Sequence, residues 1–399
     1  MNILYLNPNG TIGGAEASLL HLMAGLRTAE PRWRLSLIAG SEGPLLARAG
    51  SLGVSTQVVA FPRAIGRLGD STRRPASVRN LLSGGARIPA YVAKLRQAVR
   101  ELKPDLMHSN GFKMHLLSAC APEAGVPLIW HIHDYVRSRP LMAPLLRLCA
   151  HRCSTAVTNS SSVAEDLRSL CTRGLRIEAV HNGIDTAAFA PEGPSLDLDA
   201  IAGLAPMDKR GVRVGLLGTF ARWKGHETFL RALASVDPSI SIRGYVIGAS
   251  IYQSDGSQHS VEELKNVGRA LGLEGRVGFT GYLDDSAAAI RSLDIVVHAS
   301  TQPEPFGMVI IEAMACGKPV IVSGCGGASE IVEDRVNALT HEPGDVVALA
   351  ARIQELAMSA KLRIQLGAAG RRTAERRFDR TRFAGEFARI YRRVTGSRN

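Results

Sequence analysis

The sequence predicts an α/β protein with two doubly wound parallel sheets, and three observations lead to this expectation. The chain has 399 residues, which exceeds one ordinary hydrophobic core and suggests two domains of similar size. Its 40 glycines and its aromatic content of 5% are typical of folds with many tight strand-to-helix turns. Short apolar segments alternate with helical patterns in both halves, which is the rhythm of parallel sheets.

The first half contains six apolar segments that we expect to be strands. They are residues 3–6, 35–39, 57–60, 105–108, 128–132 and 155–158. The second half repeats the pattern at residues 212–217, 243–247, 276–279, 295–298, 320–322 and 337–340. A Pro-, Gly- and Asp-rich connection at about 185–210 separates the two halves.

These patterns divide the chain into an N-terminal domain, 1–185, and a C-terminal domain, 186–378. A final helix is expected from about 380 to 393, so we set residues 379–399 apart. Ligands of such folds bind beyond the carboxyl ends of the strands, and we expect them between the two domains. Candidate functional residues are therefore those that follow a strand.

The most informative segment is Glu304-Pro-Phe-Gly-Met-Val-Ile-Ile-Glu312, in which two carboxylates flank an apolar run. The spacing of eight residues is close to two helical turns, so we expect both carboxylates to face the same cleft. A helix N-terminus there offers unpaired N–H groups to phosphate, and carboxylates accept hydrogen bonds from hydroxyls. The segment predicts a nucleotide-sugar pocket; the alternative is a helix with one incidental surface glutamate.

Another candidate loop joins the 212–217 strand to its helix, with the sequence Gly218-Thr-Phe-Ala-Arg-Trp-Lys224-Gly225. Lys224 offers a point charge to an anionic ligand in this loop. Arg222 offers a guanidinium in the same loop, and the alternative for it is a solvated loop residue.

In the first half, Gly13-Gly14-Ala15-Glu16 follows the first strand and opens a helix, so its backbone can approach a ligand closely. A simple strand-to-helix turn is the alternative. Further on, Trp130-His131-Ile132-His133-Asp134 ends a strand. Alternation sends both imidazoles to one face, where they suit either a metal or a ligand contact, and Asp134 could orient the ring of His133. We interpret His108 as a packing residue.

The formal charge of +12 calls for an acidic partner or surface. Much of the excess lies in residues 61–100, where basic and aliphatic residues alternate and an anionic membrane surface would fit; a solvated arginine-rich loop is the alternative. No nucleic-acid recognition motif is present.

The N-terminal residues resemble no signal peptide, and no segment has the length of a membrane span. We therefore expect a cytoplasmic protein, which would be peripheral on the inner membrane face if the basic segment binds lipid.

The six cysteines are too sparse and irregular for a disulfide framework, and we expect them reduced. His151 between Cys149 and Cys153 has no second ligand pair at a suitable spacing. We therefore predict no metal and no cofactor.

The Glu304 to Glu312 segment and the Ala313-Met-Ala-Cys-Gly-Lys-Pro-Val-Ile321 run after it resemble the paired-glutamate motif of retaining glycosyltransferases of family four. These enzymes have the GT-B fold of two Rossmann-like domains. The resemblance extends over nearly the whole chain in the right order, through the glycine loop at Gly13 and Gly14, His133, Lys224, and the Gly326-Gly327 turn. In this family the last helix returns to the first domain.

The resemblance implies a role for each candidate residue. Glu304 would hold hydroxyls of the transferred sugar, with backbone N–H groups of Phe306 and Gly307 nearby, and Glu312 would bind the ribose hydroxyls. Lys224 would stabilise the departing diphosphate, and His133 would contact the sugar from the other domain. The remaining candidates on the donor side are Gly13, Gly14, Arg222 and Gly327.

One departure from the family pattern is Thr219, which stands where the family has arginine directly after the glycine, so Arg222 is the candidate replacement. Asp197-Leu-Asp199 imitates the metal-binding motif of the other large glycosyltransferase fold, and we interpret it as a solvated loop.

The resemblance implies a retaining glycosyltransferase that moves a sugar from a UDP- or GDP-type donor to a glycan or lipid-linked acceptor in cell-surface polysaccharide or glycolipid assembly. The acceptor would attack on the face that the diphosphate leaves, without a metal. Two alternatives remain: an enzyme of the same fold that processes nucleotide sugars, such as a 2-epimerase or a phosphorylase, and a catalytically silent nucleotide-sugar-binding subunit.

Overall fold

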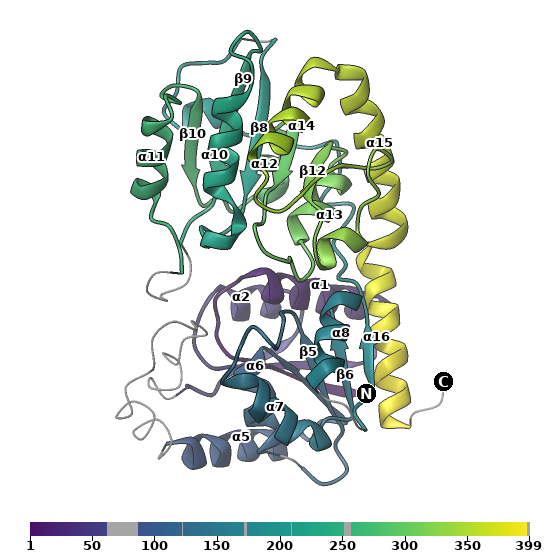
Figure 1. Ribbon diagram of the computed structural model, residues 1–399. Coiled ribbons are helices and arrows are strands. Elements are labelled where there is room, and N and C mark those ends of the chain that lie inside the picture. The colour runs from purple at the N-terminus through teal and green to yellow at the C-terminus, as the bar shows by residue number, and fades with distance from the viewer. Residues whose placement is uncertain (62–86, 122, 171–173, 209, 251–256, 397–399) are drawn as a thin grey trace. The chain divides into compact units, whose positions relative to one another are not determined.

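The computed structural model describes residues 1–61, 87–121, 123–170, 174–208, 210–250 and 257–396. The chain forms two units, each with its own parallel sheet (Figure 1). Unit 1 comprises Met1–Gly183 and Arg380–Asn399, and unit 2 comprises Ile184–Asp379. The domain boundary predicted after residue 185 lies two residues after the observed one at Gly183, and the boundary predicted after residue 378 lies one residue before the observed one at Asp379. The segment after Asp379 belongs to unit 1, although the chain reaches it only after completing unit 2.

Unit 1 has a seven-stranded parallel sheet in the order β3-β2-β1-β4-β5-β6-β7. Its strands are β1 Asn2–Asn7, β2 Arg34–Ala39, β3 Ser55–Val58, β4 Leu106–Asn110, β5 Leu128–Ile132, β6 Thr155–Thr158 and β7 Ile177–Ala179. The strand order reverses between β1 and β4, and such switch points are where doubly wound folds bind ligands. The six predicted strands are present within two residues, and β7 was missed.

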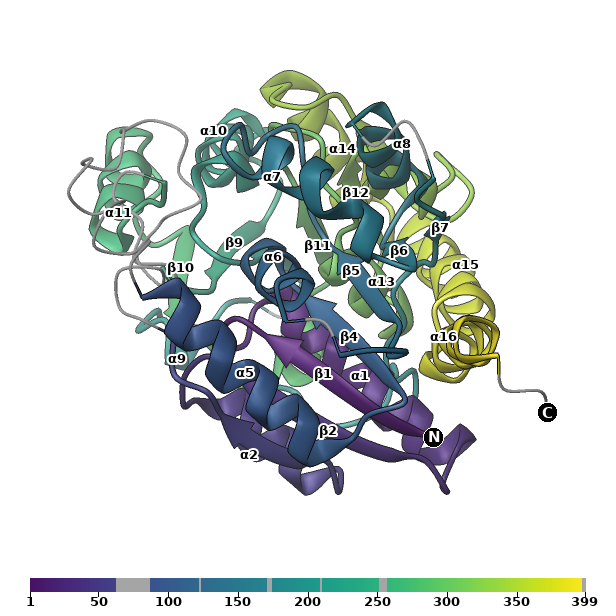
Figure 2. The ribbon, with the colours of Figure 1, turned by 90° about the horizontal axis from the view of Figure 1, so that it is seen from below.

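Helices cover both faces of this sheet. One face carries α5 Ile88–Leu102, α6 Phe112–Ala119, α7 Met142–Cys149 and α8 Ser161–Leu170, and Figure 2 looks onto the part that α5 and α6 cover. A short 3₁₀ helix, η1 Ala150–Arg152, follows α7. The opposite face carries α1 Gly14–Ala29, α2 Pro44–Ser51 and α16 Arg380–Thr395. Two buried apolar clusters therefore sandwich the sheet, as its nearly continuous hydrophobic strands require.

The last helix is an integral part of unit 1. Helix α16 packs along α1, and its buried aromatic face consists of Phe383, Phe387 and Tyr391. The Tyr391 hydroxyl lies 2.6 Å from Nδ1 of His108 on β4. His108 is thus a core residue that ties α16 to the sheet, in agreement with the predicted packing role.

Unit 2 has a six-stranded parallel sheet in the order β10-β9-β8-β11-β12-β13, and all six of its strands were predicted. They are β8 Val212–Leu217, β9 Ile242–Ile247, β10 Val277–Gly281, β11 Ile295–His298, β12 Val320–Ser323 and β13 Leu339–His341. One face packs against α10 His226–Ser235, α11 Val261–Ala270 and α14 Val346–Met358, and the other against α12 Ser286–Arg291 and α13 Met308–Ala315. The remaining elements are α9 Leu198–Ile201, η2 Arg222–Lys224, η3 Gly327–Glu330 and α15 Ala360–Arg377.

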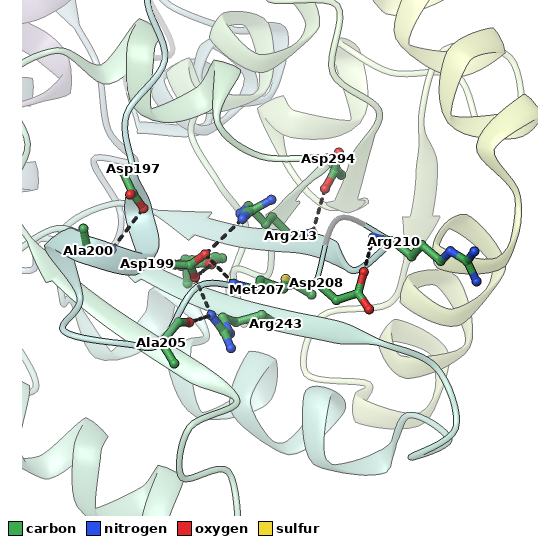
Figure 3. Close-up of polar contacts among 11 residues, drawn as sticks. Asp197, Asp199, Ala200, Ala205, Met207, Asp208, Arg210, Arg213, Arg243 and Asp294 are labelled. Carbon is green, nitrogen blue, oxygen red and sulfur yellow. Dashed lines mark hydrogen bonds and ion pairs between the residues drawn. The ribbon is translucent and has the colours of Figure 1, made fainter.

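A buried ionic cluster around Asp199 holds α9 against the sheet (Figure 3). Oδ1 of Asp199 accepts hydrogen bonds of 2.5 Å from both Arg243 and Tyr245. Oδ2 of Asp199 accepts a 2.9 Å hydrogen bond from Arg213 and a 3.1 Å hydrogen bond from the Met207 amide. Burial alone would raise the pKa of Asp199, but the hydrogen bonds from Tyr245 and Arg243 outweigh it and hold the pKa well below its usual range. The arginines stand at the amino ends of β8 and β9, away from the ligand-binding edge.

This cluster corrects the interpretation of Asp197-Leu-Asp199 as a solvated loop. Asp197 caps α9 by accepting a 3.0 Å hydrogen bond from the Ala200 amide, as helix N-cap residues do. Asp199 is only 4% exposed and is neutralised by arginine. Neither carboxylate is left in the arrangement that the metal-binding interpretation would need.

We predict that Asp199→Asn destabilises unit 2 by about 3 kcal/mol, because two arginines lose their counter-charge at a buried site. Asp197→Asn is the matched control and should change little, since asparagine caps helices as well as aspartate. The Asp199 contribution should be present above its unfolded pKa of about 3.9 and be lost as the pH falls below it. Urea unfolding of both variants at pH 7 measures the difference, and equal unfolding midpoints would contradict it.

The loop before α10 contains a glycine at a position where a side chain would clash with the backbone of a neighbouring segment. Gly225 has a φ of 76°, and a Cβ there would lie 1.8 Å from the carbonyl oxygen of Ala299, just after β11. The Thr301 amide donates a 2.7 Å hydrogen bond back to the Trp223 carbonyl. The loop that carries Lys224 is therefore in direct backbone contact with the segment that leads to Glu304.

We predict that Gly225→Ala costs about 3 kcal/mol or more, because a backbone clash adds to the strain of the left-handed conformation. Gly272→Ala is the control: its φ is also positive, at 68°, but nothing lies within 4 Å of the added methyl group. The control should cost about 1 kcal/mol. Thermal unfolding of both variants measures the effect, and similar losses of stability would mean that the loop can move away from Ala299.

Candidate functional site

The centre of the candidate site in unit 2 is the carboxylate of Glu304, which follows β11 and is 5% exposed. Its Oε2 accepts a 2.7 Å hydrogen bond from the Lys224 ammonium and a 2.8 Å bond from the Ser300 hydroxyl, and lies 3.0 Å from Nε2 of His298. Lys224 comes from η2 and the other two partners come from the end of β11. Three groups from two loops thus converge on one carboxylate oxygen.

The electrostatics keep Glu304 ionised. Burial alone would raise the pKa of Glu304, but the charge of Lys224 and the hydrogen bond of His298 outweigh it and hold the pKa well below the ordinary value. Lys224 also lies over the Trp223 ring, with Nζ 4.2 Å from the ring centroid. The site therefore contains a fixed anion beside a cation whose side chain is 23% exposed and open to a ligand.

Directly after Glu304, the N-terminus of α13 presents backbone donors. Gly307 is the N-cap, with a φ of 104°, and no side chain caps the helix. Among the described residues, no acceptor bonds the N–H groups of Gly307, Met308 or Val309. Unpaired amides at a helix N-terminus bind anions. Phe306, in contrast, is buried with its ring against Phe378 and anchors this turn in the core.

Glu312 lies in the second half of α13 and has the opposite electrostatic character. Its side chain is half-buried, and no donor of the described residues bonds its carboxylate. Burial raises the pKa of Glu312 to about 7. The two glutamates of the motif form no contact with each other: one is held charged by Lys224, whereas the other lacks partners.

The remaining predicted residues of unit 2 lie around this centre with varied roles. The exposed Arg222 bonds Glu263 at 3.1 Å and lies 3.2 Å from Nδ1 of His259, so its guanidinium is directed toward α11. The Gly327 amide donates a 2.7 Å hydrogen bond to the Glu304 carbonyl. Gly327 therefore supports the backbone of Glu304, and its own N–H is not available to a ligand.

In unit 1 the glycine loop is held by a buried network at the carboxyl ends of β1 and β4. Glu16 on α1 accepts a 3.0 Å hydrogen bond from the Gly13 amide and a 3.3 Å bond from Asn7, which in turn accepts a 2.7 Å bond from Asn110. Glu16 thus shapes the loop. A Cβ on Gly14 would meet nothing within 4 Å, so this glycine borders open space.

His133 follows β5, and its ring contacts that of His131, with centroids 3.9 Å apart and ring planes tilted by 44°. Burial lowers the pKa of His133 to about 3, so its imidazole is neutral at pH 7, and its Nε2 has no partner among the described residues. The proposal that Asp134 orients this ring is wrong, because its carboxylate bonds the Tyr135 amide at 2.8 Å and Arg139 at 2.5 Å.

The sequence did not identify three residues that contribute to the candidate sites. They are His298 and Ser300, which contact Glu304, and Asn7, which bonds Glu16 behind the glycine loop. His298 and Ser300 lie six and four residues before Glu304, where β11 ends, and that position was their only signal in the sequence. No group of three or more His, Cys, Asp or Glu side chains suited to a metal occurs in the described ranges. No helix within those ranges has the length and hydropathy to cross a membrane.

Residues 62–86, which make up most of the basic segment 61–100, lie outside the described residues.

Two protein-family models match the sequence. The model described as Glycosyltransferase Family 4 matches residues 12–188, and the model described as Glycosyl transferases group 1 matches residues 207–373. The first therefore covers most of the first segment of unit 1, and the second covers most of unit 2, including Lys224, Glu304 and Glu312.

Curated relatives and solved structures agree with these matches. A D-inositol 3-phosphate glycosyltransferase of Salinispora tropica is 29% identical over 69% of this chain and 62% of its own length. The lipopolysaccharide core biosynthesis glycosyltransferase LpsE of Rhizobium meliloti is 30% identical over 41% of this chain and 45% of its own length.

The crystal structure of HepE from Anabaena in complex with UDP and glucose is 26% identical, covers 97% of this chain and 98% of that one, and has a TM-score of 0.80. The two-sheet architecture and these matches together show that the chain belongs to the group 1 glycosyltransferases of family four and has the GT-B fold.

Proposed function

We propose that the chain transfers a sugar from a nucleoside diphosphate sugar to an acceptor hydroxyl with retention of the anomeric configuration. The observation that carries the proposal is the Lys224 to Glu304 pair at the uncapped N-terminus of α13. A cation, unpaired amides and a fixed carboxylate are the groups that a diphosphate linked to a sugar requires.

Each group has a distinct role in this proposal. Lys224 and the amides of Gly307 and Met308 would bind the diphosphate and stabilise the negative charge that grows on it as it leaves, without a metal. Glu304 would accept hydrogen bonds from hydroxyls of the transferred sugar. Since His298 and Ser300 already fix its carboxylate, Glu304 would need little reorganisation when the sugar arrives.

Glu312 would bind the nucleoside part of the donor. A half-buried carboxylate without donors is unfavourable as an anion, and the two hydroxyls of a ribose would supply the missing hydrogen bonds. The crystal structures of HepE in complex with UDP and with UDP-glucose support a uridine nucleotide as the first candidate.

The proposed reaction breaks the bond between the anomeric carbon and the diphosphate oxygen. The acceptor oxygen bonds the same carbon on the face that the diphosphate leaves, and its proton passes to the departing diphosphate. In unit 1 the neutral imidazole of His133 would hydrogen-bond a sugar hydroxyl, and Gly13 and Gly14 would let the backbone approach the donor closely. The same-face geometry rests on resemblance to retaining members of the family.

The proposed acceptor is a glycan or a lipid-linked molecule in cell-surface assembly. The relatives named for lipopolysaccharide core biosynthesis and for glycosylation of D-inositol 3-phosphate support acceptors that are themselves hydroxylated or phosphorylated. We also propose that the chain acts at the inner membrane face.

Lys224→Met should weaken binding of the donor about ten- to a hundredfold, because a charge-assisted hydrogen bond to the diphosphate is lost. Isothermal titration with a panel of UDP-, GDP-, ADP-, CMP- and dTDP-sugars, well below the unfolding temperature, measures this. Lys265→Met, which removes an exposed lysine from α11, is the matched control and should bind as the wild type does. Binding of no panel member by the wild type would overturn the proposal, and binding without transfer to any acceptor would indicate a silent subunit.

Donor affinity should depend on pH through Glu312. The ionised carboxylate accepts two hydroxyl hydrogen bonds, so below its pKa of about 7 each binding event must release a proton. The logarithm of the association constant should then rise by up to about one per pH unit and level off above pH 7. The diphosphate of a nucleotide sugar stays fully ionised throughout. Glu312→Gln should flatten this profile, whereas Glu375→Gln, on the exposed face of α15, should leave it unchanged; a flat wild-type profile would remove Glu312 from the pocket.

A further inference from the structure

Helix α7 of unit 1 and its N-cap residue expose a row of leucines that the proposed reaction does not use. Leu141, Leu145 and Leu148 are 68%, 45% and 70% exposed. Their spacing of four and three residues places them on one helical face, and Ala143 and Leu146 on the opposite face are buried in the core. We call these three side chains the leucine ridge. Because the three leucines lie next to one another, they are a candidate interaction surface, and their surroundings decide for which partner.

The surroundings of the leucine ridge are exclusively basic in sequence. Residues 135–164 contain four arginines and no Asp or Glu. Arg137 and Arg147 are exposed, and Arg152 is exposed just beyond the helix. The same face of the sheet also carries α5, with Lys94, Arg96 and Arg100 exposed at its surface. Apolar side chains between arginines suit a surface that is apolar inside and anionic at its rim.

The size of the leucine ridge also distinguishes between partners. A stable protein interface buries about 800 Å² on each partner, and three leucine side chains offer at most a few hundred Å². Shallow insertion into lipid needs only such a row, because each buried methylene group contributes about 0.8 kcal/mol and each nearby arginine adds about 1 kcal/mol at an anionic surface. We propose that the leucine ridge of α7 docks unit 1 onto an anionic phospholipid bilayer.

The connection from the candidate site to the leucine ridge is short and firmly held. Seven residues separate His133 from Leu141, and the Val136 amide donates a 2.6 Å hydrogen bond to Asp166 on α8. Arg139 pairs with Asp134 in the same segment. A bilayer on the leucine ridge would thus keep the His133 loop in a fixed place relative to the membrane surface, where a lipid-linked acceptor resides.

The test is flotation of the full chain with vesicles of phosphatidylcholine alone and of phosphatidylcholine with phosphatidylglycerol, at low and high salt. The wild type should float with the anionic vesicles and partition less at high salt. Leu141→Gln, Leu145→Gln and Leu148→Gln together should lower the partition coefficient by at least about tenfold. Arg137→Gln with Arg147→Gln should reduce the preference for anionic vesicles while sparing the leucines.

The matched control replaces three exposed apolar residues of unit 2, Val347, Met358 and Ile364, by glutamine. This variant should float as the wild type does, and equal thermal midpoints would show that all variants fold. Retained flotation of the leucine variant would overturn the proposal, as would absence of wild-type flotation. If the wild type is a dimer and the leucine substitutions dissociate it, the leucine ridge contacts a second copy of the chain and the lipid proposal is wrong. No nucleotide is present, so these outcomes are independent of the donor-binding proposal.

Discussion

The requirement that a buried carboxylate be neutralised organises unit 2. Glu304 is nearly inaccessible to water, and an isolated anion there would be strongly unfavourable. Lys224 supplies the counter-charge from a loop 80 residues away in sequence, and His298 and Ser300 supply the hydrogen bonds. The pair forces the loop after β8 against the segment after β11. The close backbone approach of Gly225 to Ala299 follows from the same requirement, because a side chain at Gly225 would hold the two loops apart.

Unit 1 also contains a buried carboxylate, that of Glu16, but no ion pair among the described residues compensates its burial. The buried carboxylate of Glu16 has only amide donors, and burial leaves its pKa raised despite the hydrogen bonds from Gly13 and Asn7. The imidazoles of His108, His131 and His133 are likewise kept neutral by burial. The described polar network behind the glycine loop therefore relies on amide donors and neutral imidazoles, which suit contact with a sugar, whereas the candidate site of unit 2 contains the charged pair of Lys224 and Glu304, which suits a diphosphate.

The fold was largely predictable because parallel strands buried on both faces appear in the sequence as continuous apolar runs. The strand that was missed, β7, has three residues and is only half-buried, so its pattern lacks that signature. Glu304 could be found from its neighbours in sequence, whereas its pairing with Lys224 depends on tertiary structure. Asp134 and Asp199 were misjudged for the same reason: the arginines that bind them are identified only when the chain has folded.

The two glutamates of the motif show why sequence spacing alone could not assign their chemistry. Glu304 is ionised before any ligand arrives, since its partners belong to the protein. Glu312 lacks such partners, and its raised pKa means that the folded protein holds a proton there more tightly than the unfolded chain does, so its contribution to stability declines as the pH rises toward 7. A ligand that donates hydrogen bonds to Glu312 would stabilise its ionised form and offset this loss of stability. Glu304 is thus preorganised by the fold, whereas the ionised form of Glu312 is unfavourable until a ligand donates hydrogen bonds to it, and this difference would couple occupancy of the proposed nucleoside pocket to the stability of unit 2.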